Sequence, residues 1–282
     1  MQKQKIGVIG AGTMGNGITQ AFAVSGFDVI MSDIGQAQVD RGLATISGSL
    51  DRLIKKEKMT AEQKATAMGH ITTVTDVAAL KDCDLIIEAA TERLDLKLDI
   101  FKKVDALAKP EAILASNTSS ISITKLAAAT QRPAQVIGMH FFNPVPMLAL
   151  VEVIRGLQTT DATYAAVEAL AKAIGKTPVQ IKNSPGFVVN RMLCPMINEA
   201  IFALGEGLAT AAEIDEAMKL GAAHPIGPLA LADLIGLDVE LAVMQVLFEG
   251  FKDPQYRPAP LLVEMVEAGY LGRKTGRGFF TY

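Results

Sequence analysis

The chain has 282 residues, 50% of them apolar and 20% charged, which is enough for two domains that each bury a core. A net charge of −3 and the lack of a long basic run argue against a nucleic-acid partner. The two cysteines lack metal-ligand spacing and are typical of buried thiols in a reducing compartment, and no apolar run reaches the roughly 20 residues of a membrane helix.

The first predicted unit is a strand, a glycine-rich turn and a helix. Lys5–Ile9 is a short β-branched run, and Gly10-Ala11-Gly12-Thr13-Met14-Gly15 follows it with G-x-G-x-x-G spacing. Gly10 permits the tight turn, Gly12 lets a pyrophosphate approach the backbone, and Gly15 lets helix and strand pack closely. The N–H groups at the helix start suit a phosphate, so the pattern predicts a dinucleotide site. Because the first strand begins this early, we expect no targeting peptide and a cytoplasmic protein.

A second strand, Asp28–Ser32, ends in Asp33, which lies 23 residues after Gly10. A carboxylate at about this position accepts hydrogen bonds from the adenosine ribose diol. It would repel a 2′-phosphate, and no arginine follows it closely. The sequence therefore predicts NAD rather than NADP as the cofactor.

The next segment interrupts the alternation of strands and helices. Asp51–Lys56 and Glu57–Ala67 together predict an inserted helical arm. Its basic cluster could attract a multiply phosphorylated substrate, and the alternative is a solvated helix face. The cluster contains Arg52, Lys55, Lys56 and Lys58.

Further strand-like runs alternate with helical patterns and predict an α/β fold with a doubly wound, mostly parallel Rossmann-type sheet. The runs are Leu85–Ala89, Ile113–Asn117, Val136–Met139 and Leu150–Ile154. Four polar residues follow the carboxyl ends of predicted strands, where such sheets hold ligands. They are Glu92, Lys97, Asn117 and Ser119.

His140 follows the strand-like run Gln135–Met139 and is one of three histidines. Histidine has an unperturbed pKa near neutrality, so at the mouth of a cofactor cleft it can both give and take a proton. This placement predicts a dehydrogenase with His140 as its acid/base. The alternative is a histidine that is hydrogen-bonded for structural reasons. His70, in a predicted loop, and His224, beside a proline, are not candidates for the base.

A domain boundary is expected near Asn183-Ser184-Pro185-Gly186. We assign residues 1–184 to a dinucleotide-binding domain with the helical arm and residues 185–282 to an all-helical domain. The helices of the second domain carry more apolar surface than about a hundred residues need for a core. We expect that surface to form a homodimer.

The motifs along the whole chain resemble the short-chain L-3-hydroxyacyl-CoA dehydrogenase family, and within it the bacterial 3-hydroxybutyryl-CoA dehydrogenases. Besides the glycine-rich turn, the matching motifs are Ser116-Asn117-Thr118-Ser119-Ser120, His140-Phe141-Phe142-Asn143-Pro144-Val145-Pro146, Leu150-Val151-Glu152-Val153, Pro185-Gly186-Phe187-Val188-Val189-Asn190-Arg191, Ala222-Ala223-His224-Pro225-Ile226-Gly227-Pro228 and Lys274-Thr275-Gly276-Arg277-Gly278-Phe279. The resemblance implies a Rossmann-type domain, a helical dimerisation domain, NAD, and reversible oxidation of a (3S)-3-hydroxyacyl-CoA.

The resemblance also implies roles for individual residues. His140 is the catalytic histidine and Glu152 its partner carboxylate, which fixes the ring tautomer and stabilises the imidazolium. Ser119 and Asn190 hydrogen-bond the reacting oxygens. Ser49 and Lys56 of the arm meet the CoA moiety. The implied cofactor positions are Gly10, Gly12, Met14, Gly15, Asp33, Glu92, Lys97, Asn117 and Ser119.

Three of these residues could instead have purely structural roles. Glu152 could be a surface carboxylate on an edge strand, Ser119 could cap the helix expected to start near Ile121, and Asn190 could brace the first helix of the second domain.

Two other functions are also considered. A β-hydroxyacid dehydrogenase that acts on a free acid would carry a catalytic lysine on the first helix of the second domain, where this chain has none before Lys219. A non-catalytic NAD-binding protein would be free to lose His140 or Glu152, and both are present.

Overall fold

The computed structural model describes residues 4–282, which divide into two compact units. The first unit ends at Asn183 and the second is Ser184–Tyr282. Within the described residues, no helix combines the length and apolar character needed to cross a bilayer.

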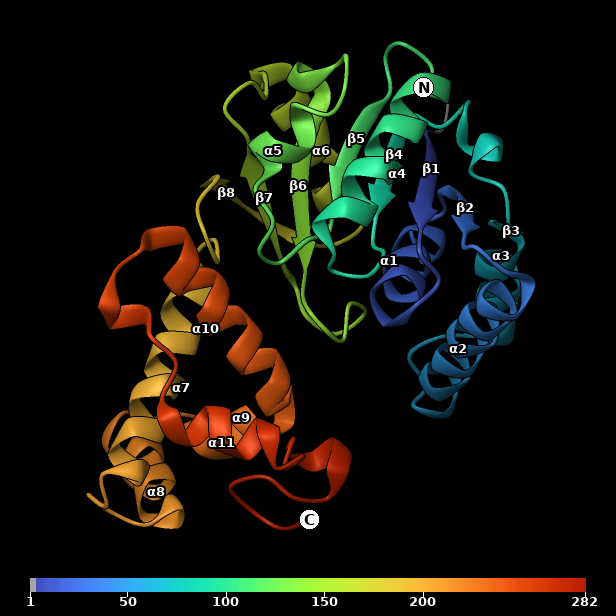
Figure 1. The fold of residues 1–282 in the computed structure, drawn as a ribbon. Coiled ribbons are helices and arrows are strands. Elements are labelled where there is room, and N and C mark those ends of the chain that lie inside the picture. The colour runs from blue at the N-terminus through green and yellow to red at the C-terminus, as the bar shows by residue number, and fades with distance from the viewer. Residues whose placement is uncertain (1–3) are drawn as a thin grey trace. The chain divides into compact units, whose positions relative to one another are not determined.

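The first unit is built on one eight-stranded sheet with the strand order β3-β2-β1-β4-β5-β6-β7-β8 (Figure 1). The strands are β1 (Lys5–Ile9), β2 (Asp28–Ser32), β3 (Ile71–Val74), β4 (Leu85–Glu88), β5 (Ile113–Ser116), β6 (Val136–Phe141), β7 (Leu150–Arg155) and β8 (Thr177–Lys182). All neighbours are parallel except β6 and β7, which are antiparallel. This confirms the predicted mostly parallel, doubly wound sheet. The strand order reverses between β1 and β4, which is where such sheets bind ligands.

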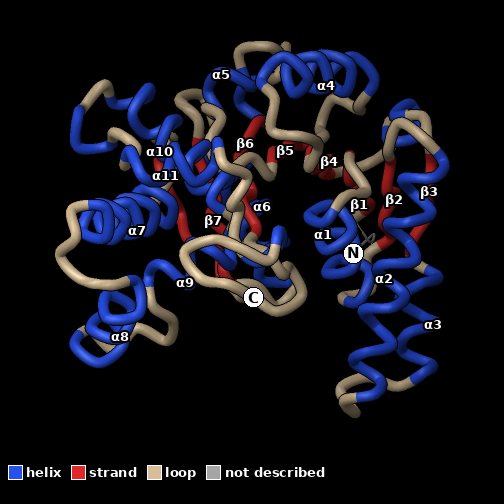
Figure 2. The backbone as a smooth tube through the Cα atoms, turned by 60° about the horizontal axis from the view of Figure 1, so that its bottom comes forward, coloured by secondary structure: helices blue, strands red, loops and turns tan. Residues whose placement is uncertain are grey.

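Helices cover both faces of this sheet (Figure 2). On one face lie α1 (Thr13–Val24) and α6 (Asp161–Ala173), and on the other lie α4 (Leu94–Leu107) and α5 (Ile123–Ala127). Apolar residues of α1 and α6 pack in a single core with those of the strands, among them Phe22 and Val167. The strands are near-continuous apolar runs because the central sheet is buried on both sides.

The helical arm follows β2 and consists of α2 (Gln36–Lys55) and α3 (Ala61–Gly69), joined by a short turn. Val39, Ile46 and Leu50 recur at helical spacing on α2 and are fully buried, together with Ala67 of α3. Thr60 and Gln63 form a capping box that starts α3. The predicted arm is therefore present, but its first helix begins well before the predicted Asp51.

The second unit is helical, as predicted. Its helices are α7 (Val189–Gly205), α8 (Ala211–Gly221), α9 (Pro228–Ile235), α10 (Leu237–Phe251) and α11 (Pro260–Glu267). Four of them, all but α8, contribute fully buried side chains to one core, such as Ile197, Leu229, Leu237 and Leu262. Short 3-10 turns complete the chain at η1 (Val77–Leu80), η2 (Pro133–Gln135), η3 (Pro254–Tyr256) and η4 (Arg273–Thr275).

Candidate active site

His140 and Glu152 lie directly opposite each other on the antiparallel strands β6 and β7. The His140 Nδ1 atom is 2.7 Å from Glu152 Oε2, and the two residues are 7% and 1% exposed. The edge-strand alternative for Glu152 is wrong, because β8 pairs along the outer side of β7. Directly opposed residues of an antiparallel pair have neighbouring side chains, so the strand register alone brings this imidazole and carboxylate together.

The pairing determines what the imidazole can do. An ionised carboxylate only accepts hydrogen bonds, so Nδ1 of His140 donates to Glu152. In the neutral ring, Nε2 then carries the lone pair and is the atom that can take a proton. The buried carboxylate stabilises the imidazolium that results, which is the arrangement required of a general acid/base.

Ser119 lies in a segment that follows β5 and is held by Glu92. One carboxylate oxygen of Glu92 accepts from the Ser119 N–H at 3.1 Å and from the Ser120 hydroxyl at 3.0 Å, and it also accepts from Thr118 Oγ1. Burial acts to raise the pKa of Glu92, but the charge of Lys97 and these hydroxyl donors outweigh it and lower the pKa below its ordinary value. Glu92 is therefore an ionised acceptor beside Ser119.

The helix-cap alternative for Ser119 is wrong. The helix α5 begins at Ile123, and its N-cap is Ser122, whose side chain accepts from the Lys125 N–H. Ser119 is thus placed by Glu92 rather than by a helix terminus.

Asn117 joins this segment to the strand that carries His140. Its backbone N–H donates to the carbonyl oxygen of Glu88 at 2.8 Å, and its side-chain Oδ1 accepts from the N–H of Phe141 at 2.9 Å. Phe141 is the residue after His140, so Asn117 fixes the end of β6 against the end of β5. The sequence predicted a cofactor contact for Asn117 and gave no sign of this link.

Lys97 is 1% exposed, and its ammonium group is surrounded by acceptors. Its Nζ donates to Glu88 Oε1 at 2.7 Å and to the Ala90 carbonyl at 3.2 Å, and lies 3.2 Å from Glu92 Oε2. The sequence predicted Lys97 as a cofactor residue and did not identify Glu88. The missed signal was an acidic residue at the end of the otherwise apolar run Leu85-Ile86-Ile87.

The glycine-rich turn has the close contacts that its spacing predicts. Gly10 has φ of +104°, and a Cβ atom on Gly15 would lie 1.7 Å from the Gly10 carbonyl oxygen. A Cβ on Gly12 would meet nothing within 4 Å, so the chain itself leaves the space beside Gly12 open. Met14 sits in the first turn of α1 and packs against the core of the sheet.

Asp33 closes the other side of this turn. Its Oδ2 accepts from the Ala11 N–H and its Oδ1 from the Ile34 N–H, both at 2.7 Å. The bond to Ala11 ties the end of β2 to the glycine-rich turn. Each carboxylate oxygen can still accept a further bond from a ligand hydroxyl.

A cleft of about 380 Å³ lies over the carboxyl ends of β1, β2 and β4. Gly10, Gly12 and Asp33 line it, together with the apolar side chains of Ile34 and Leu96. Backbone for phosphate, a carboxylate for a ribose diol and apolar walls for a flat purine are the groups that adenine dinucleotides require. These residues fit the adenosine half of NAD.

The residues predicted to meet CoA lie on the arm. Ser49 is on α2, and Lys56 immediately follows that helix as its C-cap. Seven residues span nearly two turns, so both belong to one side of the arm. Lys56 is exposed to solvent, as an approaching phosphate would require.

Asn190 lies in the first turn of α7, in the second unit. The structure therefore groups His140, Glu152, Ser119 and Asn117 in the first unit, while the role predicted for Asn190 stays a prediction. Among residues 4–282, no three histidine, cysteine or acidic side chains are grouped as a metal site would need.

Both units match known family profiles. Residues 5–184 match "3-hydroxyacyl-CoA dehydrogenase, NAD binding domain", and residues 186–282 match "3-hydroxyacyl-CoA dehydrogenase, C-terminal domain". Together the two matches span nearly the whole chain.

Individual proteins are similar over their full length. The chain is 54% identical to the 3-hydroxybutyryl-CoA dehydrogenase of Bradyrhizobium diazoefficiens, covering 99% of this chain and 95% of that one. It is also 54% identical to the enzyme of the same name from Clostridioides difficile, covering 99% of each. The crystal structure of (S)-3-hydroxybutyryl-CoA dehydrogenase from Ralstonia eutropha superimposes with a TM-score of 0.97 at 64% identity, covering 100% of this chain and 99% of that one.

Proposed function

Since the chain belongs to the 3-hydroxyacyl-CoA dehydrogenase family, we propose that it catalyses the NAD-dependent, reversible oxidation of (3S)-3-hydroxybutyryl-CoA to acetoacetyl-CoA. The observation that carries the proposal is the buried His140–Glu152 pair, at 2.7 Å, in the same unit as a dinucleotide cleft. A binding protein has no need of a buried imidazole–carboxylate pair, because its function involves no proton transfer.

His140 is the acid/base of the proposed reaction. In oxidation, its Nε2 removes the proton of the 3-hydroxyl group, and the imidazolium is stabilised by Glu152. NAD, when bound, supplies the acceptor for the hydride of C3. In reduction, His140 returns the proton to the carbonyl oxygen.

Ser119 and Asn190 are the proposed hydrogen-bonding groups for the reacting oxygens. Ser119 suits this role because Glu92 holds its backbone N–H and thereby fixes the segment that carries its hydroxyl group. Asn190 offers an amide that can donate or accept. Ser49 and Lys56 are the proposed contacts for CoA, with the lysine as a point charge for phosphate.

The proposed cofactor residues lie in and around the dinucleotide cleft. Gly10, Gly12, Met14 and Gly15 shape the phosphate-binding turn, and Asp33 receives the ribose hydroxyls. The remaining proposed positions at the carboxyl ends of β4 and β5 are Glu92, Lys97 and Asn117.

One assay tests the proposed reaction. The consumption of NADH is followed by its absorbance with acetoacetyl-CoA, with longer 3-oxoacyl-CoAs and with free acetoacetate. We expect turnover of the short CoA ester and much slower turnover of the free acid. Equal rates with free acetoacetate would support a free-acid dehydrogenase instead, and no turnover of any substrate would support a non-catalytic NAD-binding protein.

We further propose that the chain forms a homodimer through its helical unit and resides in the cytoplasm. Several large apolar side chains of this unit are exposed in the single chain, among them Met192, Leu208 and Leu220. Light scattering on the purified protein tests the dimer, and a monomeric mass would reject it. Both cysteines are free and buried, and free thiols without disulfides are typical of proteins in a reducing compartment.

A further inference from the structure

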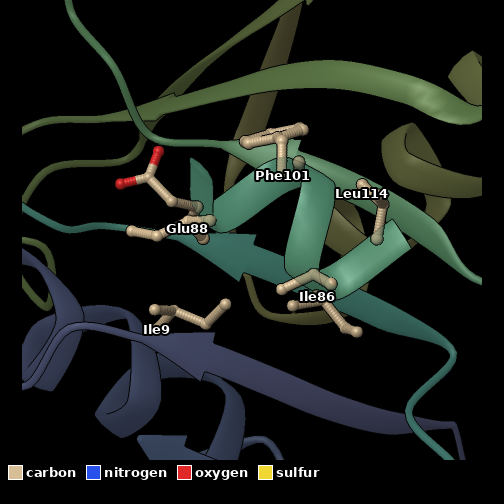
Figure 3. Close-up of a pocket in the computed structure, with 8 residues that line it drawn as sticks. Ile9, Ile86, Glu88, Phe101 and Leu114 are labelled. Atoms are coloured by element: carbon tan, nitrogen blue, oxygen red, sulfur yellow. The ribbon is translucent and has the colours of Figure 1, made fainter. Parts of the chain in front are cut away.

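Glu88 is a buried carboxylate at the end of β4 that lies beneath the proposed active site. It is 2% exposed, and both of its oxygens are hydrogen-bonded. Oε1 accepts from the Ala90 N–H at 2.6 Å and from Lys97 Nζ at 2.7 Å, while Oε2 accepts from the Ser116 hydroxyl at 2.7 Å. Figure 3 shows the carboxylate pointing away from the apolar side chains of Ile86 and Leu114. The small void among those side chains, about 10 Å³, offers the carboxylate no other partner.

A first path leads from Glu88 to Ser119 through Lys97. The Lys97 ammonium bridges Glu88 Oε1 at 2.7 Å and Glu92 Oε2 at 3.2 Å. The other oxygen of Glu92 accepts from the Ser119 N–H at 3.1 Å. Two charged groups, Lys97 and Glu92, therefore connect the Glu88 carboxylate to the backbone of Ser119, and Glu88 and Lys97 are in direct, buried contact.

A second path leads through Ser116. The Ser116 hydroxyl donates its proton to Glu88 Oε2. The same hydroxyl oxygen, Ser116 Oγ, accepts a hydrogen bond from the Thr118 N–H at 3.1 Å. The backbone of Glu88 also accepts from the Asn117 N–H, and the Asn117 side chain accepts from the Phe141 N–H. Both ends of the segment 117–120 are thus tied to Glu88, and through Asn117 the segment is tied to the strand of His140.

The charge of this network is unusual for a structural core. Glu88 and Lys97 are almost fully buried, and with Glu92 the three groups carry a net charge of about −1 when all are ionised. A buried ion pair is often no more stabilising than apolar side chains of similar volume, because desolvation offsets the attraction. The Glu88–Lys97–Glu92 network is therefore poorly explained by a gain in folding stability. It is better explained by a need to hold segment 117–120 in one geometry at the substrate.

We propose that Glu88 is a positioning residue of the catalytic site, which sets the Ser119 hydroxyl relative to His140 through Lys97–Glu92 on one side and Ser116–Thr118 on the other. The inference rests on the proposed function, since it assigns Ser119 to the reacting oxygen. In this arrangement Lys97 is held by three acceptors of the protein and supports Glu92.

The test is Glu88→Gln, which keeps the shape and removes the charge. We expect kcat with acetoacetyl-CoA to fall about 10- to 100-fold, as for other supporting partners of a site, while the KM for NADH changes less than about twofold. The matched control is Asp105→Asn on the same helix as Lys97. The Asp105 side chain is 8% exposed and lies 2.7 Å from Arg132 Nε, so it is a largely buried ion-pair partner, but it lies at the far end of α4. This control should lower the melting temperature and leave kcat unchanged.

Ser116→Ala provides a second variant in case Glu88→Gln does not fold. It cuts one path without changing any buried charge, so we expect a smaller loss of kcat at unchanged NADH affinity, measured by quenching of NADH fluorescence. A double variant, Glu88→Gln with Lys97→Met, should be less impaired than Lys97→Met alone, because it leaves no unpaired carboxylate at position 88.

The outcomes separate this inference from the proposed function. An inactive wild-type protein would overturn the function, and this inference with it. An active wild type with full kcat in both Glu88→Gln and Ser116→Ala would overturn only the inference. So would a loss of kcat in Asp105→Asn as large as that in Glu88→Gln at a similar fall in melting temperature, because the loss would then reflect destabilisation alone.

Discussion

At the scale of single residues, the catalytic pair is produced by strand register. His140 and Glu152 are separated by only a short connection, and antiparallel pairing places them opposite each other in the sheet interior. Neither residue would be kept buried for packing alone, because each carries a polar group that must find a partner. The joint burial of His140 and Glu152 therefore indicates acid/base chemistry at this place in the fold.

The first prediction concerns the carboxylate of that pair. Glu152→Gln keeps a hydrogen-bond acceptor for His140 Nδ1 but cannot stabilise the imidazolium by charge. We expect the kcat of Glu152→Gln to fall by about 10²- to 10⁴-fold, the usual contribution of general acid/base catalysis. The kcat of His140→Ala should fall at least as far. Steady-state rates with acetoacetyl-CoA measure the loss, and a fluorescence titration should show NADH affinity close to that of the wild type. Full activity in either variant would reject the assignment.

The second prediction concerns Asp33 and cofactor choice. Its carboxylate lines the dinucleotide cleft, where it attracts a ribose diol and repels a 2′-phosphate. Asp33→Ser should lower kcat/KM for NADH by about tenfold and bring it closer to the value for NADPH, since each lost charged hydrogen bond costs about 1.5–3 kcal/mol. Asp40→Ser, an exposed carboxylate on α2, is the control and should leave the preference unchanged. An unaltered NADH preference in Asp33→Ser would place the specificity elsewhere.

At the scale of elements, two glycines of the β1–α1 turn are required for different reasons, one for packing and one for ligand binding. A Cβ at position 15 would overlap the Gly10 carbonyl oxygen, which is 1.7 Å away, whereas a Cβ at position 12 would lie in open space. The two positions belong to one motif, but only Gly15 is required by the protein itself.

The third prediction compares these two glycines. Gly15→Ala should lower the melting temperature by several degrees, because helix and strand must move apart. Gly12→Ala should keep the wild-type melting temperature and still weaken NADH binding, since the added methyl group occupies the space expected for the pyrophosphate. Thermal unfolding by circular dichroism and an NADH titration distinguish the two effects. Equal destabilisation by both variants would contradict this account.

Part of the fold and of the candidate site could be predicted from the sequence. The central strands, the glycine-rich turn and the His140 position were predictable, because each depends on local pattern or on motif order. The strands β3 and β8 were not predicted: Ile71–Val74 is short and half polar, and Thr177–Lys182 alternates and contains Pro178, as edge strands do.

Side-chain pairings between distant segments could not be predicted. The contact of Glu92 with residues 118–120 and the Glu88–Lys97 pair depend on which strands become neighbours, and a single sequence gives only the order of the strands. The alternative of a helix cap at Ser119 was wrong for the same reason, because Glu92 holds that segment and the helix begins later, at Ile123, with Ser122 as its N-cap.

At the scale of the whole molecule, buried carboxylates of both units are bound by cations or hydrogen-bond donors, with one exception. In the first unit, Glu88 and Glu152 are paired with cations or hydrogen-bond donors. In the second unit, Asp233 accepts from Phe279 N–H, Phe280 N–H and the Tyr282 hydroxyl, and so fastens the C-terminal residues to α9. Glu240 is the exception within the described chain: it is 0% exposed, and its carboxylate has no partner stronger than the neighbouring thiol of Cys194, a weak donor.

The fourth prediction follows from Glu240. Burial raises its pKa from 4.5 to about 8, and a hydrogen bond from the thiol of Cys194 on α7 offsets the shift only in part. An acid with a raised pKa in the folded state stabilises the fold fully below its ordinary pKa, and this stability is lost as the pH rises toward the folded value. The helical unit should therefore lose up to about 1.4 kcal/mol of stability for each pH unit between 4.5 and about 8.

Glu240→Gln removes the ionisation and should make the urea midpoint of the helical unit nearly independent of pH over this range, with a gain in stability at the alkaline end. Because the amide fills the same volume without acquiring a charge, packing around Met244 and Leu247 of the same helix is preserved. Circular dichroism in urea at about pH 5 and about pH 8 measures the difference. Glu249→Gln, an exposed carboxylate on the same helix, is the control and should retain the wild-type pH dependence. If Glu240→Gln retained it too, another titrating group would have to be responsible, and Glu240 would be ionised without cost in the folded protein.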